Sequence, residues 1–247
     1  MTGQTNFHPP QEMLEHFAHG TLSTGPSVAV SAHVELCTSC RELAGALEAE
    51  ATRSWLQDPQ AESVSHSQSD SQSGFQSGFQ SDSQSDFAAL IESIVATPQQ
   101  REARRDGSAV SEIHMHECSV TLPRVLAKIA SDGLVWKKLA GGINQAAVSL
   151  DDETQCEFIY MKPGSQVPIH RHQGNEITLV LEGSFSDELG AYRPSDFVLR
   201  DRSHHHQPVS EEGCLCFAVL DSPLTFTRGL ARLLNPILRY RFNRATA

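Results

Sequence analysis

Hydrophobic residues recur at helical spacing through the N-terminal quarter of the chain. Met13, Leu14 and Phe17 repeat at one-turn intervals, and Gly20 follows them as a stop signal. The same kind of pattern predicts three short helices, over residues 10–20, 27–32 and 40–58. Three short helices form a weak core, so a bundle of this size needs an additional crosslink such as a bound metal ion.

A low-complexity segment interrupts this helical pattern. Residues 63–86 are dominated by Ser, Gln, Asp and Gly, a composition that cannot bury enough apolar surface to offset the ordering of its backbone. We therefore predict a flexible insertion. An amphipathic helix is predicted over residues 87–97, followed by a polar linker at 98–109. This helix either packs on its own domain or is a fourth helix of the N-terminal bundle. Its apolar stripe consists of Phe87, Leu90, Ile91, Ile94 and Val95.

From residue 110 onward, hydrophobic positions alternate in short runs separated by turn residues, as in β-strands. The runs are residues 135–139, 146–150, 156–161, 177–181, 196–199 and 214–220. They predict a small antiparallel sandwich or barrel, closed by a strand or helix over residues 230–242. The expected fold class is α+β and multidomain, with a small helical bundle followed by a β-domain.

The first candidate metal site is a His-x3-Cys-x2-Cys array of His33, Cys37 and Cys40. If residues 32–40 form one helix, these side chains lie along one face of it. Two thiolates and an imidazole suit zinc, and His8 is our candidate for the fourth ligand. The alternatives are a redox dithiol, or buried cysteines beside a surface histidine. The histidine at helical spacing favours the metal.

A second group of metal-binding residue types lies in the β-region. His170 and His172 are two positions apart, so on a strand both rings face the same side, and Glu176 can return a carboxylate to that space. We expect His206 to complete a site of three imidazoles and one carboxylate. His204 would share a strand face with His206 and is the alternative ligand. The competing interpretation is a metal-free barrel with surface histidines.

Composition narrows the classes of function. The formal net charge of −11 over 247 residues argues against sequence-independent DNA binding, which depends on Lys and Arg. No apolar run approaches the roughly 20 residues of a membrane span, and the N-terminus lacks the order of a secretory signal. We expect a cytoplasmic protein, without membrane or direct nucleic-acid contacts, that either acts through a protein partner or is acidic for solubility alone. Cys214 and Cys216 either pack inward or form an oxidisable pair.

The N-terminal array resembles the zinc-binding domain of bacterial zinc-dependent anti-sigma factors. In that family, a small helical bundle holds zinc, clamps an alternative sigma factor and keeps it from RNA polymerase. A fourth helix contributes to the clamp, a role that the helix at residues 87–97 would fill. The resemblance implies that the zinc ligands are His8, His33, Cys37 and Cys40.

Residues 164–183 match the first cupin motif at every defining position. The second motif is degraded, with Ser195, Asp201 and Ser203 in place of its usual Gly, Pro and Gly, and Ser210 in place of its Asn. His206 nevertheless occupies the metal-binding position. The resemblance implies a cupin β-barrel that holds a divalent metal, expected to be zinc, through His170, His172, Glu176 and His206.

An anti-sigma domain followed by a cupin is the arrangement of the ChrR family of anti-sigma factors. The resemblance implies sequestration of an extracytoplasmic-function sigma factor and its release under oxidative stress, for example by singlet oxygen or organic hydroperoxides, without enzymatic activity. The alternative is a metal-dependent cupin enzyme that oxidises a small molecule as a dioxygenase does. The implied domains are zinc-binding helices at 1–62, the insertion at 63–86, the fourth helix at 87–97, a linker at 98–109 and a cupin sensor at 110–247.

Overall fold

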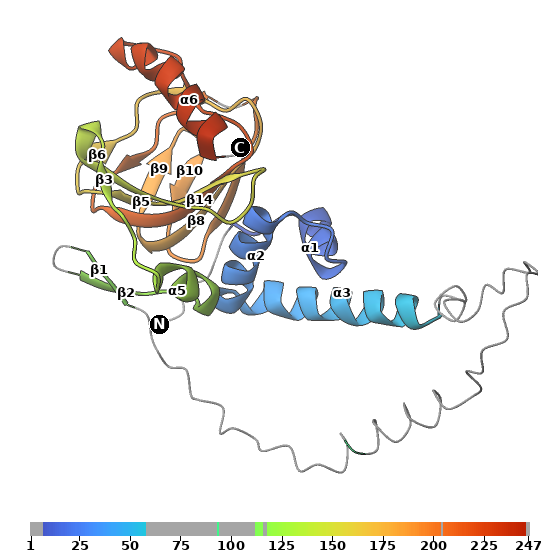
Figure 1. Ribbon diagram of the computed structural model, residues 1–247. Helices are drawn as coiled ribbons and strands as arrows, with labels where there is room; N and C mark the ends of the chain where they lie inside the picture. The colour runs from blue at the N-terminus through green and yellow to red at the C-terminus, as the bar shows by residue number, and fades with distance from the viewer. Residues whose placement is uncertain (1–6, 58–92, 94–111, 116–117, 204, 246–247) are drawn as a thin grey trace, which may run out of the picture. The chain divides into compact units, whose positions relative to one another are not determined.

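Helices form the N-terminal part of the chain (Figure 1). The computed structural model describes residues 7–57, 93, 112–115, 118–203 and 205–245. Its first helices are α1 (Gln11–Ala18), α2 (Thr24–Leu36) and α3 (Thr38–Gln57). The three predicted helices are confirmed, although α2 extends beyond the expected residues 27–32 at both ends.

The helix that we expected to run through residues 32–40 is interrupted at Cys37. This residue has extended backbone angles, φ −113° and ψ 113°, and separates α2 from α3. A straight helix would spread the three motif residues over about 10 Å of its axis, because each residue rises about 1.5 Å. The expectation of one continuous helical face was therefore wrong. The break is what allows the three side chains to converge.

Antiparallel strands form the following β-domain. Its largest sheet has six strands in the order β11-β8-β14-β5-β4-β3. Each run of alternating residues that we predicted overlaps one of these strands. Their bounds are β3 (Lys137–Lys138), β4 (Ile143–Val148), β5 (Gln155–Met161), β8 (Glu176–Gly183), β11 (Phe197–Arg200) and β14 (Cys214–Leu220).

Two of the smaller sheets complete the barrel, and a third consists of β1 (Glu112–Met115) and β2 (Cys118–Thr121) alone. Val180 and Val198 of the six-stranded sheet pack in one cluster with Phe185 and Tyr192 of the four-stranded sheet, so the sheets enclose an interior. The predicted antiparallel barrel is confirmed. One small sheet has the order β10-β9-β13-β6, with β6 (Ser165–Gln166), β9 (Phe185–Asp187), β10 (Gly190–Tyr192) and β13 (Val209–Ser210). The other has the order β12-β7-β15, with β7 (His170–Arg171), β12 (His205–His206) and β15 (Thr225–Phe226).

The six-stranded sheet is covered on both faces. In β14, Cys216 packs into the barrel interior, whereas the next residue, Phe217, belongs to a cluster that includes Val30 of α2. All seven residues of β14 are buried, as in a central strand covered on both sides. The N-terminal helices and the barrel thus share a hydrophobic core, within the compact unit of residues 1–54 and 110–247.

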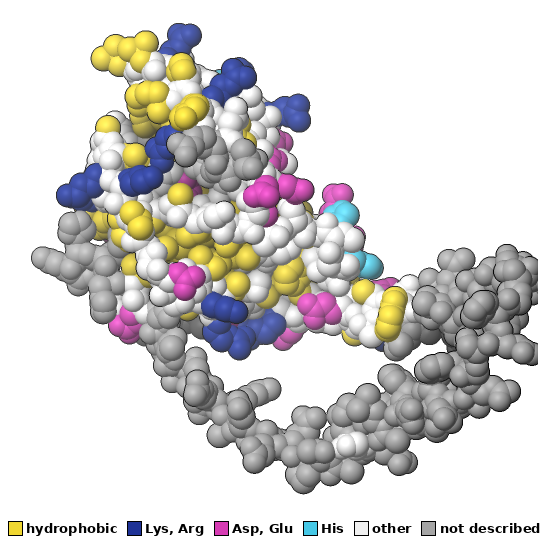
Figure 2. All heavy atoms as spheres, viewed as in Figure 1, with side chains coloured by type: hydrophobic (Ala, Val, Ile, Leu, Met, Phe, Trp, Pro, Cys, Tyr) yellow, Lys and Arg dark blue, Asp and Glu magenta, His cyan; other side chains and the backbone are white. Residues whose placement is uncertain are grey.

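The remaining elements lie around the barrel. The helix α5 (Arg124–Ala130) was not predicted, although Pro123 directly before it is typical of a helix start. The chain closes with a helix rather than a strand, and Figure 2 shows apolar and basic side chains gathered over this C-terminal helix. The other bounds are η1 (Ala140–Gly142), η2 (Leu230–Leu234) and α6 (Asn235–Ala245).

Several predictions concern residues that the structure does not describe. These are the insertion at residues 63–86, the linker at 98–109 and, apart from Ser93, the helix at 87–97. The four expected domain boundaries lie there too, so the division into domains stays a prediction. Within the described residues, no helix is both long and apolar enough to cross a membrane.

Candidate functional site: two metal centres

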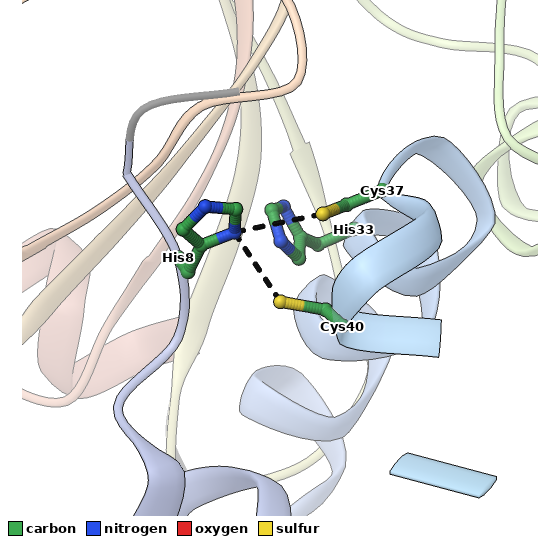
Figure 3. Close-up of side chains that lie close together, drawn as sticks. All are labelled: His8, His33, Cys37 and Cys40. Carbon is green, nitrogen blue, oxygen red and sulfur yellow. Dashed lines mark hydrogen bonds between the residues drawn. The ribbon is translucent and has the colours of Figure 1, made fainter. Parts of the chain in front are cut away.

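Four side chains converge at the N-terminal cluster, which consists of His8, His33, Cys37 and Cys40 (Figure 3). His33 lies in the last turn of α2, Cys37 between the two helices, and Cys40 in the first turn of α3, while His8 precedes α1. Their ligand atoms all lie within 4.8 Å of one another. The structure brings together the residues predicted from the sequence, and their role as ligands stays a prediction.

The donor atoms of the N-terminal cluster fit a tetrahedral zinc ion. Bonds of about 2.3 Å to sulfur and about 2.0 Å to nitrogen place neighbouring ligand atoms about 3.5 Å apart in a tetrahedron. The Nδ1 atom of His8 lies 3.5 Å from Cys37 Sγ and 3.3 Å from Cys40 Sγ. The separations therefore agree with two edges of such a tetrahedron.

The hydrogen bonding of the His33 ring leaves the lone pair of its Nε2 atom available to a metal ion. Its Nδ1–H donates a hydrogen bond of 3.0 Å to the backbone oxygen of Ser195, so its Nε2 carries no proton. That Nε2 is buried and has no hydrogen-bond partner within the described part of the chain. A buried acceptor without a partner is costly, and a metal ion among the four ligands would satisfy it.

The pKa values of the cluster also suit a cation. Burial, together with the charge of His8, lowers the pKa of His33 to about 4, so its ring is a neutral ligand at pH 7. Burial and the neighbouring Cys37 raise the pKa of Cys40 to about 12. Burial opposes the ionisation of Cys37 as well, but hydrogen bonds with Ser39 and Cys40 lower its pKa overall. The two sulfurs thus favour a single negative charge, and a divalent cation would allow the second.

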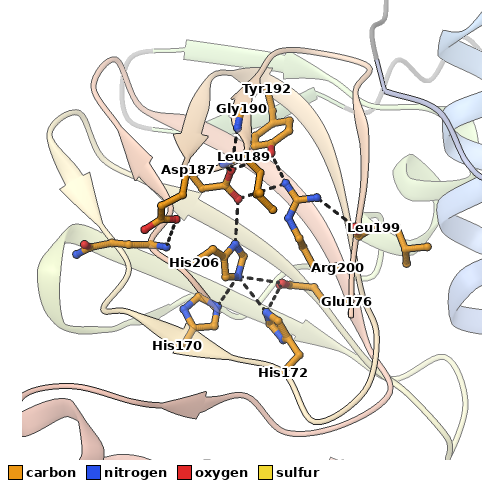
Figure 4. A network of polar contacts seen from close by, with 12 residues as sticks. His170, His172, Glu176, Asp187, Leu189, Gly190, Tyr192, Leu199, Arg200 and His206 are labelled. Atoms are coloured by element: carbon orange, nitrogen blue, oxygen red, sulfur yellow. Dashed lines mark hydrogen bonds and ion pairs between the residues drawn. The ribbon is translucent and has the colours of Figure 1, made fainter. Parts of the chain in front are cut away.

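A second cluster, the barrel cluster of His170, His172, Glu176 and His206, lies inside the β-domain (Figure 4). Strand β12 pairs with β7 so that His206 lies directly opposite His170, and Glu176 is the first residue of β8. All four side chains are buried, and their donor atoms lie within 4.8 Å of one another. These are again the predicted residues, and their role as ligands stays a prediction.

The donor atoms of the barrel cluster are spaced as ligands of one ion. His206 Nε2 lies 2.9 Å from His170 Nε2 and 3.0 Å from His172 Nε2. His172 Nε2 lies 2.9 Å from an oxygen of Glu176. Bonds of about 2.1 Å that meet at right angles place two ligand atoms about 3.0 Å apart. The spacing therefore fits ligands that would hold one shared cation.

The surrounding protein fixes which nitrogen of two rings faces the barrel cluster. The Nδ1–H of His170 donates to the backbone oxygen of Pro168 at 2.9 Å, and the Nδ1–H of His206 donates to Asp187 Oδ2 at 3.1 Å. Both Nε2 atoms are left as acceptors. Hydrogen bonds of this kind orient histidine ligands and raise their basicity. His172 lacks one, because its buried Nδ1 has no partner among the described residues.

Glu176 supplies the negative charge of the barrel cluster. Burial alone would raise the pKa of Glu176, but the charge and hydrogen bond of His172, with the other two rings, lower it to about 2. Burial lowers the pKa of His170 to about 4 in spite of that carboxylate. A carboxylate beside imidazoles, one of them held neutral, is a donor set for a divalent metal.

A cavity of about 80 Å³ adjoins the barrel cluster. Its walls are mostly apolar and include Ile159, Val198 and Leu220. Since one water molecule needs about 10–15 Å³ of such space, the cavity can hold a small molecule. Three of the four predicted ligands line it, namely His170, Glu176 and His206.

The other sequence candidates have different outcomes. His204 lies outside the described residues, and His205 is exposed and not part of the cluster. Cys214 and Cys216 both pack inward, with their sulfur atoms 3.9 Å apart and both thiols free. Sequence analysis missed Asp187, which lies 19 residues before His206 in no recognisable motif.

Comparisons with known proteins cover most of the chain. A family model described as the ChrR cupin-like domain matches residues 126–222. The anti-sigma-E factor ChrR of Cereibacter sphaeroides is 30% identical over 237 residues, which cover 94% of this chain and 97% of that protein. The crystal structure of Rhodobacter sphaeroides SigE in complex with the anti-sigma ChrR is similar with a TM-score of 0.62 and 26% identity, over 88% of this chain and 100% of the matched chain.

Proposed function

We propose that this chain, which belongs to the ChrR family of anti-sigma factors, sequesters an extracytoplasmic-function sigma factor and keeps it from RNA polymerase. The observation that carries the proposal is the similarity to an anti-sigma-E factor along nearly the whole chain. The similarity in fold to a ChrR chain from a complex with SigE supports the same partner. The negative net charge favours a protein partner over DNA.

The helix α3 is the described element that we expect to contact the sigma factor. Leu43 and Trp55 on this helix are 40% and 68% exposed, and exposed apolar side chains that gather on one element mark interaction sites. In contrast, α2 already buries Val30 and Ala32 in the core shared with the barrel. Of these two N-terminal helices, α3 therefore leaves more apolar surface exposed to a partner.

The N-terminal cluster would hold zinc, and the barrel cluster would hold a divalent metal that we expect to be zinc as well. When bound, the N-terminal ion would crosslink α2, α3 and the segment before α1. His8, His33, Cys37 and Cys40 would be its ligands. His170, His172, Glu176 and His206 would hold the barrel ion.

We infer that the barrel receives the signal that releases the sigma factor. The family resemblance predicts an oxidant such as singlet oxygen or an organic hydroperoxide, acting on a cytoplasmic protein. The cavity supports this inference because it gives a small molecule access to three of the predicted ligands and to Cys216. Thiols are among the groups that such oxidants attack.

The full chain, co-expressed with an extracytoplasmic-function sigma factor of the same organism, tests both parts of the proposal. We expect the two proteins to co-purify, and a sigma-dependent promoter to be repressed until hydroperoxide or singlet oxygen is supplied. Leu43→Asp should weaken the complex. Leu189→Asp is the matched control, because Leu189 is 51% exposed on the barrel. No complex would reject sequestration, whereas a complex that ignores both oxidants would reject only the sensing role.

A metal-dependent cupin enzyme is the second candidate. The observation in its favour is the apolar cavity beside three imidazoles and a carboxylate, an arrangement in which a small substrate could meet a metal. Oxygen consumption by the metal-loaded full chain, followed over a panel of small apolar substrates, tests this function. Turnover that disappears in His170→Ala would favour the enzyme, and no turnover with any member would favour the sensor.

A further inference from the structure

The backbone next to His8 is bound to the barrel rather than to the helices. The N–H of Phe7 donates to Asp196 Oδ1 at 3.4 Å, and the backbone oxygen of Phe7 accepts from the N–H of Phe197 at 3.0 Å. The ring of Phe7 packs edge-to-face on Tyr192, with ring centroids 4.9 Å apart. The position of His8 in the N-terminal cluster is therefore set by the barrel.

A second ligand of the N-terminal cluster is also held by the barrel. The hydrogen bond from His33 ends on Ser195, in the turn between β10 and β11. Ser195 has a φ of 77°, and it is the one non-glycine residue with positive φ in the described part of the chain. This backbone region is strained for residues with a side chain, so the rest of the turn must hold Ser195 there. Asp196 does so in part, by accepting a hydrogen bond of 2.9 Å from the N–H of Arg193.

Tyr192, on which Phe7 packs, is also connected to the barrel cluster through Asp187. Tyr192 donates its hydroxyl hydrogen to Asp187 Oδ1 at 2.9 Å, and the other oxygen of that carboxylate accepts from His206 at 3.1 Å (Figure 4). Tyr192 is 1% exposed, and the carboxylate side chain of Asp187 is fully buried. Closely packed groups of this kind transmit small displacements, because they have little room to relax separately.

We propose that Asp187, Tyr192 and Phe7 are positioning residues that couple the two metal centres. This inference rests on the proposed function, because it takes both clusters as metal sites. A change at the barrel cluster that moves His206 displaces Asp187 and the Tyr192 ring. Phe7 and the adjoining His8 follow that ring. Occupancy of one centre then changes the affinity of the other, and the coupling is reciprocal.

Cobalt in the full chain provides a signal specific for the N-terminal cluster. Its two cysteines give bound Co²⁺ a thiolate-to-metal absorption band, which the nitrogen and oxygen donors of the barrel cluster cannot produce. We would measure the rate at which this band disappears into excess chelator. His172→Ala removes a barrel donor but keeps both His206 and Asp187 in the sequence. It should change that rate by at least about fivefold.

The coupling should disappear when its middle link is removed. In a Tyr192→Phe background, which keeps the ring on Phe7 but loses the hydroxyl, His172→Ala should change the rate by less than about twofold, as for independent sites. Phe7→Leu tests the far end of the link and replaces no residue of the barrel, should Tyr192→Phe disturb the barrel itself. Tyr240→Phe is the matched control, because Tyr240 is 63% exposed on α6, and the full effect should persist there.

The possible outcomes distinguish a failure of the coupling from a failure of the proposed metal sites. An unchanged rate in His172→Ala would overturn the coupling while leaving both metal sites in place. So would an effect of His172→Ala that is as large in the Tyr192→Phe and Phe7→Leu backgrounds as in the wild type. A wild-type chain without the thiolate band would overturn the N-terminal metal site and the coupling with it.

Discussion

The backbone N–H of Gly25, in the first turn of α2, donates a hydrogen bond of 2.8 Å to the carboxylate of Asp151. The two residues are 126 positions apart in sequence. The N-terminus of a helix carries partial positive charge and unpaired N–H groups, so a carboxylate there stabilises the contact. This bond fixes the start of α2 on the loop between β4 and β5.

Gly25→Ala should weaken the packing of α2 on the barrel. A Cβ at this position would lie 2.3 Å from Thr154 Oγ1 and 2.9 Å from Cys156 Sγ, so the free energy of unfolding should fall by about 1–3 kcal/mol. Gly45→Ala on α3 is the matched control, because nothing lies within 4 Å of its added Cβ. That change should raise stability by about 0.5–1 kcal/mol. Denaturant unfolding of the full chain measures both, and equal stability of the two variants would contradict the packing described.

Acid should weaken the same contact. Burial alone would raise the pKa of Asp151, but hydrogen bonds from the Thr154 hydroxyl and from backbone N–H groups, including that of Gly25, lower it overall. A carboxyl with a lowered pKa stabilises the fold above its ordinary pKa of about 3.9 and loses that contribution as the pH falls further. The free energy of unfolding should therefore decline below about pH 4, and less steeply in Asp151→Asn. In Asp132→Asn, which alters an exposed carboxylate, the decline should match the wild type.

Loss of the N-terminal thiolates should abolish both metal binding and sequestration. Cys37→Ser with Cys40→Ser removes two of the four predicted ligands, and a small bundle depends on its ion for much of its folding free energy. We expect one fewer zinc per chain by elemental analysis and no co-purified sigma factor. Cys156→Ala, which removes a buried thiol outside both clusters, should keep both properties. A double variant that retains the N-terminal zinc would refute the ligand assignment.

The barrel cluster should be needed for release rather than for repression. His170→Ala with His172→Ala removes two predicted ligands of the barrel ion but none of the N-terminal cluster. We expect repression of a sigma-dependent promoter to persist and the response to hydroperoxide or singlet oxygen to be reduced, because a population shift requires a chemical change at the barrel. Full derepression without oxidant would instead make the barrel part of the clamp.

Much of the fold was predictable because its signals are local. The period of Met13, Leu14 and Phe17 depends on neighbouring turns of one helix, and the apolar runs of β5 and β14 each lie within a single strand. The short helix α5 was missed because its seven residues make only about two turns, too short a window to establish a helical period. The division into domains and the fourth helix stay predictions, since they fall outside the described residues.

The amino-acid sequence alone identified both sets of candidate ligands, because His33 with the two cysteines, and His170 with His172 and Glu176, lie within a few residues of one another. Only the tertiary structure decided how each set is held. The chain leaves helical geometry at Cys37, and the bonds from His206 to Asp187 and from His33 to Ser195 join residues 19 and 162 positions apart. Such pairs form when separate elements pack together, so no periodicity or spacing within a segment records them.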